Sequence, residues 1–260
     1  MNIHNQKQAL FVDTKIGKIA VYIKEVKTDD LPIIFLHGVY FDHHLWDNQI
    51  EYLTQRTTIS IDMPLHGKSR INIISNWTLQ DCANMLIDIL DALNLKKVIA
   101  VGHSWGSMTI LRAASKNPDR FSSIGFCNMP FLSPTKKQEV IFALQHPLLF
   151  FRNFYTSQTA KFLFGRVSLK NNPSLLMQLK LTMDILSRKE LIKVDETVII
   201  NAKDVTGLII NLKVKAIALI GKEDYVQIPP LIETIVVDGG HVSPLENPTE
   251  VLKMIKRLVS

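Results

Sequence analysis

The sequence is poor in cysteine, in glycine and proline, and in long apolar runs. Its two cysteines, Cys82 and Cys127, have no C-x-x-C spacing, which argues against a disulfide scaffold and favours reduced thiols in the cytoplasm. Glycine and proline number 11 each, too few for a low-complexity chain. No stretch offers the roughly 18 apolar residues of a membrane-spanning helix, and residues 1–7 lack the apolar segment of a signal peptide. We therefore expect a globular, cytoplasmic protein without a membrane span.

Acidic residues are scarce in the middle of the chain. Residues 131–203 carry 11 Lys and Arg against 5 Asp and Glu, whereas the remainder carries 19 of each sign. A surface of one sign attracts partners of the opposite sign. The basic residues form no dense run interleaved with aromatics, so we expect no nucleic-acid partner.

Strands and helices alternate on both sides of this basic segment. Residues 10–13 and 18–24 alternate apolar and polar side chains around Gly17, which predicts an antiparallel hairpin. Short apolar runs predict buried strands at 33–36, 58–62, 98–101, 123–127, 216–220 and 234–237. Helical patterns lie at 45–53, 79–93, 105–115 and 249–258, with Thr78 as the N-cap of the second. This order predicts an α/β fold with a mostly parallel central sheet flanked by helices.

Residues 130–203 interrupt that alternation with an aromatic, helical pattern. We interpret this segment as a helical cap inserted into a core domain made of residues 1–129 and 204–260. Phe142, Phe150 and Phe154 are its candidate substrate-binding side chains, because ligand pockets are largely apolar.

The motif with the clearest chemistry is Gly102-His103-Ser104-Trp105-Gly106. It lies between a predicted strand and a predicted helix. A serine on such a sharp turn is strained and exposed, which suits it to attack a carbonyl carbon. A serine hydroxyl also needs a base, because it is a poor nucleophile at neutral pH.

Candidates for the base and its orienting acid follow the last two predicted strands. His241 comes after the strand at 234–237, and Asp224 comes after the strand at 216–220. Only residues 221–232 separate these strands, and Pro229-Pro230 argue against a helix there. This abbreviated crossover leaves Glu223 open as an alternative acid.

A site for the developing oxyanion has candidates as well. The backbone N–H groups of Val39, after the strand at 33–36, and of Trp105 would point at the negative charge that forms during acyl transfer.

Together these motifs resemble the serine hydrolases of the α/β-hydrolase superfamily. The similarity rests on His-Gly at 37–38, Asp-x-Pro-x-His-Gly-x-Ser at 62–69, Gly-His-Ser-x-Gly at 102–106, Gly-x-x-Asp at 221–224 and Gly-His at 240–241. It implies an α/β-hydrolase fold and a cofactor-free serine esterase of the carboxylesterase type, with Ser104, His241 and Asp224 as its catalytic triad. Leu65 stands where the family often has glycine, so we expect a less tight turn there.

The expected reaction is cleavage of an ester or thioester through an acyl-enzyme. One candidate substrate is an acyl ester on an acidic acyl carrier protein, bound through Lys136, Lys137 and Arg152, as the resemblance to carboxylesterases of biotin synthesis implies. Cofactor-free C–C bond hydrolases and haloperoxidases or perhydrolases of the same fold remain alternatives. So does a ligand-binding protein or receptor of this fold with slow turnover.

The adjacent histidines His43 and His44 invite comparison with a metal site. We expect the two side chains to project apart at a helix start, and no carboxylate-rich spacing accompanies them. The sequence therefore predicts neither a metal site nor a cofactor.

Overall fold

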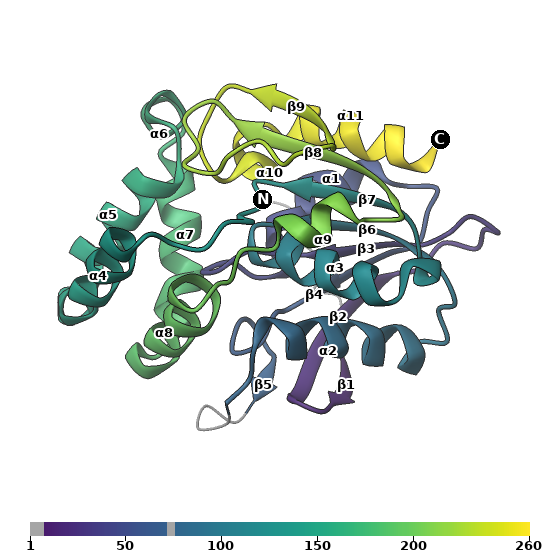
Figure 1. Cartoon of the computed structure of the whole chain (residues 1–260), viewed down its shortest axis with the longest axis horizontal. Coiled ribbons are helices and arrows are strands. Elements are labelled where there is room, and N and C mark those ends of the chain that lie inside the picture. Colours follow the sequence, from purple (N-terminus) through teal and green to yellow (C-terminus); the bar gives the residue numbers. More distant parts are fainter. Residues whose placement is uncertain (1–7, 72–75) are drawn as a thin grey trace.

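The computed structural model describes residues 8–71 and 76–260. Residues 1–7, for which we predict no signal peptide, lie outside the described part. A large sheet crosses the molecule, with helices on both faces and a further group of helices at one end (Figure 1). None of the described helices combines the length and the apolar composition needed to cross a bilayer.

The sheet has nine strands in the described residues, and most of them are parallel. Their order is β1-β2-β4-β3-β6-β7-β8-β9, with β5 paired to β2. Strands β1 and β2 form the predicted hairpin, β2 is antiparallel to β4 and β5, and the pairs from β4 to β9 are parallel. Their bounds are β1 Leu10–Thr14, β2 Gly17–Lys24, β3 Ile33–Leu36, β4 Thr58–Ile61, β5 Arg70–Ile71, β6 Val98–His103, β7 Phe121–Cys127, β8 Lys215–Gly221 and β9 Glu233–Val237.

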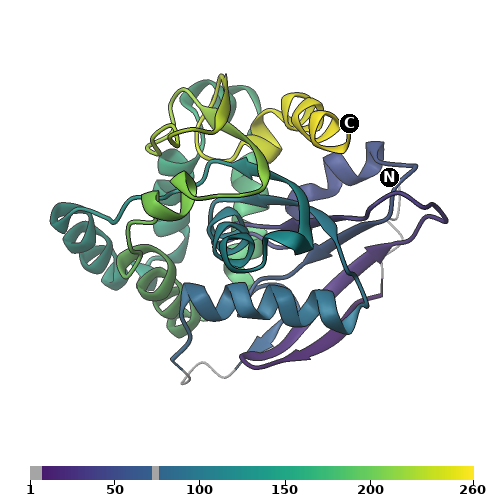
Figure 2. The ribbon, with the colours of Figure 1, turned by 45° about the vertical axis from the view of Figure 1, so that its right-hand side comes forward.

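Helices cover both faces of this sheet, as predicted. The helices α2 (Leu79–Ala92) and α3 (Trp105–Lys116) pack on one face, and α1 (Asp47–Tyr52) and α11 (Pro248–Val259) pack on the other (Figure 2). Thr78 caps α2 through a capping box with Asp81. Between α3 and β7 lies the short helix η2 (Pro118–Arg120). Since every residue of β3, β4 and β6 is buried, the core lies between the sheet and these helices.

Two local features differ from the sequence predictions. The helix predicted over 45–53 begins earlier, as the 3-10 turn η1 (His43–Trp46), because the Asp42 carboxylate accepts the His44 N–H. The turn at Leu65 is tight, contrary to expectation: the His66 N–H donates to the Met63 carbonyl at 2.9 Å. Leu65 adopts φ 69°, a left-handed conformation that costs a bulky residue about 1–3 kcal/mol. Its side chain is buried, and that burial offsets the strain.

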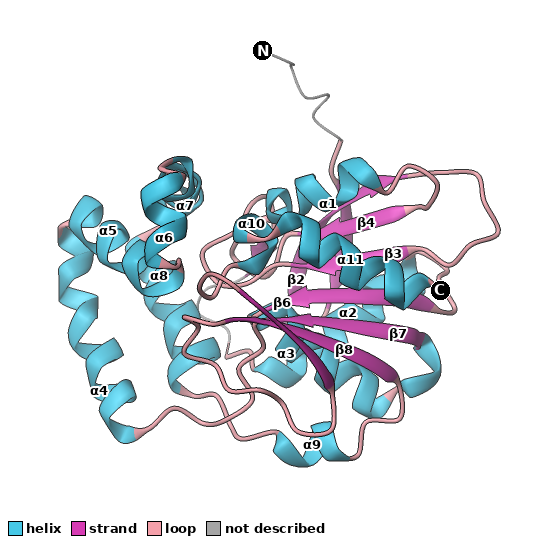
Figure 3. Cartoon of the chain, turned by 90° about the horizontal axis from the view of Figure 1, so that it is seen from above, coloured by secondary structure: helices cyan, strands magenta, loops and turns pink. Residues whose placement is uncertain are grey.

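A helical segment joins β7 to β8, and most of it forms the end of the molecule away from the sheet, whereas its last helix packs against α3 (Figure 3). Its elements are α4 Lys136–Gln145, η3 His146–Phe150, α5 Arg152–Leu163, α6 Arg166–Asn171, α7 Ser174–Ile185, α8 Arg188–Val194, η4 Asp195–Ile200 and α9 Thr206–Ile210. The segment contacts loops at the carboxyl ends of two strands. The Tyr40 hydroxyl, after β3, donates to Asp195 at 2.6 Å, and the His241 N–H, after β9, donates to the Leu163 carbonyl at 2.6 Å.

Candidate active site

Ser104 lies on the sharp turn between β6 and α3. Its backbone has φ 48° and ψ −110°, a strained conformation for a residue with a side chain. The flanking glycines make the turn possible. A Cβ on Gly102 would come within 2.4 Å of the Ser107 nitrogen, and one on Gly106 within 2.2 Å of the Leu36 carbonyl oxygen. The G-x-S-x-G pattern is therefore a packing requirement of this turn.

The structure brings Ser104 and the two predicted partners together. The Ser104 Oγ lies 2.9 Å from His241 Nε2, and His241 Nδ1 lies 2.9 Å from Asp224 Oδ1. With the proton on Nδ1, His241 donates to Asp224 and accepts the Ser104 hydroxyl proton at Nε2. The His241 and Asp224 side chains are almost completely buried. This geometry is that of a nucleophile, a base and an orienting acid.

Asp224 reaches His241 despite the short crossover between β8 and β9. Residues 222–232, all of them described, hold no helix, as Pro229-Pro230 predicted. The chain instead turns immediately: the Lys222 N–H donates to the Val237 carbonyl at 2.8 Å, and the Asp224 N–H donates to the Gly221 carbonyl at 3.1 Å. Glu223, the alternative acid, faces the other way and accepts the Arg166 N–H at 3.3 Å.

Hydrogen bonds keep Asp224 ionised. Burial alone would raise the pKa of this carboxyl, but the charge and hydrogen bond of His241 and the hydrogen bond of Asn128 lower it below its ordinary value. Asn128 Nδ2 donates to Asp224 Oδ2 at 2.7 Å, and its Oδ1 accepts the Ser243 N–H at 3.2 Å. Asn128 thus connects Asp224 to the loop that carries His241.

The two predicted oxyanion donors, Val39 and Trp105, lie after β3 and at the start of α3. Among the described residues, neither N–H has a hydrogen-bond acceptor, whereas the neighbouring Gly106 N–H donates to the His37 carbonyl at 3.1 Å. Trp105 is also the first residue of a twelve-residue helix, whose N-terminal end favours negative charge.

Buried histidines brace these loops. His37 Nε2 accepts the Met63 N–H at 2.8 Å, and His66 Nε2 accepts the Tyr40 N–H at 3.1 Å. His103 Nε2 lies 2.7 Å from the His241 carbonyl oxygen, to which it donates. Because burial disfavours the charged imidazolium, the pKa values fall to about 3 for His37, about 4 for His66 and about 3 for His103.

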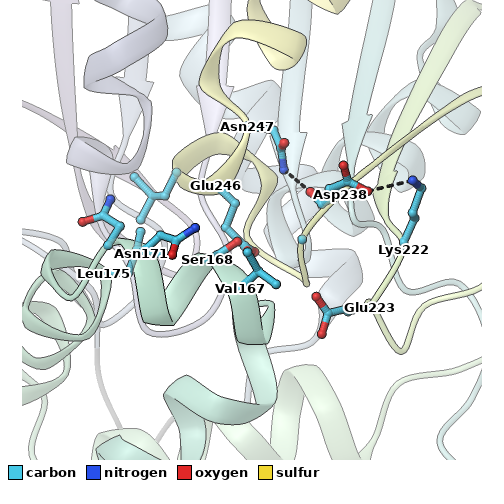
Figure 4. A pocket seen from close by; sticks show the side chains of 12 residues that line it. Val167, Ser168, Asn171, Leu175, Lys222, Glu223, Asp238, Glu246 and Asn247 are labelled. Atoms are coloured by element: carbon cyan, nitrogen blue, oxygen red, sulfur yellow. Dashed lines mark hydrogen bonds and ion pairs between the residues drawn. The ribbon is translucent and has the colours of Figure 1, made fainter.

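A carboxylate that the sequence analysis missed holds the histidine loop in place. Glu246 accepts the Gly240 N–H at 3.0 Å and the Val242 N–H at 3.1 Å, one on each side of His241. It also accepts the Gly165 N–H at the start of α6, at 2.8 Å. Figure 4 shows Glu246 beside a cavity of about 540 Å³ that Ser104 does not line. Glu246 therefore connects the loop that carries His241 to the helical segment.

The aromatic side chains of the helical segment fall into two groups. Phe142 packs edge-on against Phe162 with ring centroids 6.3 Å apart. Phe162 stacks on Tyr225 at 4.8 Å, and Tyr225 stacks on His241 at 4.6 Å. This row leads from α4 to the base, and the Tyr225 hydroxyl lies 3.3 Å from His241 Nε2.

Phe150 and Phe154 belong to the other group. Phe150 is 73% exposed and Phe154 is 53% exposed, and the Arg188 guanidinium lies 3.7 Å above the Phe150 ring. Their part in substrate binding stays a prediction.

The basic residues predicted to contact a carrier protein differ in their exposure and in the partners they already have. Lys136 is highly exposed and pairs with Glu139 at 2.9 Å, and Lys137 is exposed. The Arg152 guanidinium donates to the carbonyls of Met183 and Leu186 at the end of α7. Arg152 thus caps a helix, and the carrier protein stays a prediction.

The expectation that His43 and His44 project apart is wrong. Their ring centroids lie 4.0 Å apart, and one ligand atom from each comes within 4.8 Å of a carboxylate oxygen of Asp42. Contacts with other segments fix the rings, because His43 also stacks on Tyr22 with ring centroids 3.5 Å apart. Both Nδ1 atoms are engaged, His43 with Asp62 at 2.8 Å and His44 with Asp47 at 2.7 Å.

Four contributors to the site were missed: Asn128, Phe162, Tyr225 and Glu246. Asn128 directly follows the predicted strand at 123–127, and Tyr225 follows the candidate acid, so position at the carboxyl edge of the sheet could have indicated both. Phe162 was one of many aromatics in a helical pattern. Glu246 had no local signal, because its role depends on how a five-residue loop folds back.

Comparison with known proteins agrees with this architecture. The sequence model of the α/β hydrolase fold family matches residues 32–178. An (E)-2-((N-methylformamido)methylene)succinate hydrolase of Acinetobacter baylyi is 34% identical over 98 residues, which are 37% of this chain and 37% of that protein. The alignment thus spans little more than a third of that curated relative.

Two solved structures share the fold along almost the whole chain. A thermophilic esterase from Thermogutta terrifontis has a TM-score of 0.81 at 21% identity, covering 96% of this chain and 97% of its own. An enol-lactonase from Burkholderia xenovorans has a TM-score of 0.85 at 16% identity, covering 96% and 99%. Because the family's sequence model matches more than half of the residues, the chain belongs to the α/β-hydrolase fold family.

Proposed function

We propose that this protein is a serine hydrolase that cleaves a carboxylic ester or thioester through an acyl-enzyme. The observation that carries the proposal is the relay from Asp224 through His241 to the Ser104 hydroxyl, with both hydrogen bonds at 2.9 Å. An esterase and an enol-lactonase among the proteins of similar fold support an ester as the substrate class.

The first half of the proposed reaction acylates Ser104. His241 Nε2 takes the hydroxyl proton while Oγ attacks the acyl carbon, and the carbonyl π electrons move onto oxygen. The amides of Val39 and Trp105 stabilise that oxyanion, and Asp224 stabilises the imidazolium. The imidazolium then gives its proton to the leaving alcohol or thiol as the bond from the acyl carbon breaks.

The second half releases the acid. His241, now neutral, takes a proton from water, and the hydroxide oxygen attacks the acyl carbon. Collapse of the second tetrahedral intermediate breaks the bond to Ser104 Oγ, which regains its proton from His241. In this proposal, residues 130–203 serve as the cap over the site, and the row of Phe142, Phe162 and Tyr225 forms the apolar wall along which an acyl chain lies.

A panel of p-nitrophenyl esters of increasing chain length tests this proposal. We expect turnover by the wild type and none above background by Ser104→Ala, with Asp224→Asn reduced about 10³- to 10⁴-fold because it destabilises the imidazolium and favours the wrong tautomer. Glu223→Gln is the matched control and should retain nearly full activity. Unchanged turnover in a folded Ser104→Ala protein would exclude the mechanism.

A further inference from the structure

The helical segment between β7 and β8 leaves one of its helices largely exposed. Helix α4 contains no buried residue, although its sequence includes Val140, Ile141 and Leu144. Figures 1 and 3 place it at the end of the molecule away from the sheet. A ten-residue helix gains little stability by itself, and an exposed apolar helix face usually marks an interaction site.

The next two elements also carry exposed apolar side chains. Phe150 ends η3, Phe151 follows it, and Phe154 lies in the first turn of α5. We call the following six side chains the apolar tip: Val140, Ile141, Leu144, Phe150, Phe151 and Phe154. Each of them is between 43% and 73% exposed.

Basic side chains lie next to parts of the apolar tip. Lys136 and Lys137 begin α4 and are exposed, and the Arg188 guanidinium lies over the Phe150 ring. The acidic Glu139 on α4 is paired with Lys136. Exposed phenylalanines and leucines beside lysines and arginines are the combination that lies flat on an anionic lipid surface, with the rings among the acyl chains and the cations at the headgroups.

We infer that the apolar tip docks this protein onto an anionic lipid surface. Charge favours this occupant over a second copy of the chain, because two copies would bring the same positive charge together. The row of Phe142, Phe162 and Tyr225 then connects the docked end with His241 through ring contacts of 6.3, 4.8 and 4.6 Å.

This contact also narrows the substrate class, a step that rests on the proposed hydrolase function. A long-chain acyl ester dissolved in the lipid surface would reach Ser104 along that row, whose Phe162 and Tyr225 rings are exposed. The docking itself does not depend on catalysis.

Co-sedimentation with vesicles tests the docking. The probes are vesicles of phosphatidylcholine alone and of phosphatidylcholine mixed with phosphatidylglycerol. We expect the wild type and Ser104→Ala to bind the anionic vesicles equally and to lose binding as salt rises. The double variants Leu144→Ser/Phe151→Ser and Lys136→Glu/Lys137→Glu should each bind at least about tenfold more weakly.

Tyr52→Ser/Leu231→Ser is the matched control, because these core-domain side chains are 70% and 83% exposed. It should bind like the wild type. Binding of Leu144→Ser/Phe151→Ser at wild-type strength, or equal binding of the wild type to neutral and anionic vesicles, would overturn the inference. The inference would also be overturned if light scattering showed a wild-type dimer that Leu144→Ser/Phe151→Ser converts to a monomer. The same holds if the wild type bound an acidic carrier protein in preference to the vesicles.

Activity separates the two proposals. Leu144→Ser/Phe151→Ser should hydrolyse a short p-nitrophenyl ester at the wild-type rate but a long-chain ester in anionic vesicles at least about tenfold more slowly. Absence of short-ester turnover in the wild type would refute the proposed function and leave the sedimentation result standing.

Discussion

At the residue scale, carboxylates that lie close together in the chain have different hydrogen-bond partners in the site. Asp224 and Glu223 are neighbours, yet only Asp224 faces His241, since the turn after β8 directs alternate side chains to opposite sides. Glu246 never touches Ser104. It holds the amides of Gly240 and Val242 and so fixes the loop on which His241 lies. We therefore regard Glu246 as a positioning residue.

Replacing Glu246 should loosen His241 without removing it. The carboxylate accepts hydrogen bonds from three N–H groups, and the single amide oxygen of Glu246→Gln cannot accept all three. Since a misplacement of about 1 Å can cost about 10²-fold in rate, we expect kcat to fall about 10- to 100-fold with little change in KM.

Steady-state kinetics on one p-nitrophenyl ester measures this change, and circular dichroism melting checks the fold. The control is Glu250→Gln, which removes a surface carboxylate that pairs with Lys253. If Glu246→Gln retained wild-type kcat, or raised KM alone, Glu246 would have no positioning role.

The sequence could predict which candidate residues lie together where chemistry and chain position coincide. Ser104, Asp224 and His241 each follow a strand at the carboxyl edge of the sheet, so a parallel sheet brings them together without further information. Asn128 and Glu246 act through hydrogen bonds to backbone amides. Such contacts depend on loop conformation, which no residue pattern in this chain encodes.

At the element scale, the helices α4 and α3 differ most in how much of each is buried. Ten of the twelve residues of α3 are buried, and the helix packs against α2 and β6. Helix α4 buries none of its residues and is held at its start by a capping box between Thr135 and Gln138. Sequence periodicity predicted helix in both places, but it could not tell that α4 lacks a face to pack against.

Hydrogen exchange should show this difference. The amides of α4 open through local unfolding, whereas those in the middle of α3 open only with the whole domain. We expect α4 to exchange at least about 10²-fold faster than α3 in mass-spectrometric measurements, because a short helix with few tertiary contacts is only marginally stable. Equal protection of the two helices would show that α4 is packed in solution.

At the scale of the whole molecule, stability depends on histidines that fold in the neutral form. His37, His66 and His103 have pKa values of about 3, 4 and 3 because burial disfavours their charge. The unfolded chain takes up protons at an ordinary histidine pKa of about 6.5. Each histidine therefore makes its full contribution to stability above about pH 6.5. That contribution is lost as the pH falls toward the pKa of the histidine in the folded protein.

This linkage predicts acid sensitivity that single variants can dissect. As the pH falls from 6 to 5, each neutral histidine lowers the free energy of unfolding by about 1.4 kcal/mol per pH unit. Asp42 and Asp195, whose pKa values are raised by burial, act in the opposite direction, so the total slope is smaller than three such contributions.

His66→Gln isolates one contribution, since the glutamine oxygen can still accept the Tyr40 N–H. In urea titrations at pH 5 and 6, its slope of unfolding free energy against pH should be lower than that of the wild type by about 1.4 kcal/mol per unit. An unchanged slope would mean that His66 is not neutral in the folded protein.

The same scale shows how far the sequence alone could go. The alternation of apolar runs and helical patterns predicted the mostly parallel sheet with helices on both faces, because burial on both faces leaves a readable pattern. The conformation of Leu65, the convergence of His43 and His44, and the position of the apolar tip arise from packing between distant segments, which no local pattern records.

The central claim is that Ser104 is a nucleophile activated by His241. Fluorophosphonate labelling followed by intact-mass and peptide mass spectrometry tests it most directly, because the reagent traps an activated serine whatever the natural substrate is. We predict one adduct per chain, on Ser104, absent from Ser104→Ala and slowed in Asp224→Asn. A folded wild-type protein that takes up no adduct at Ser104 would contradict the claim.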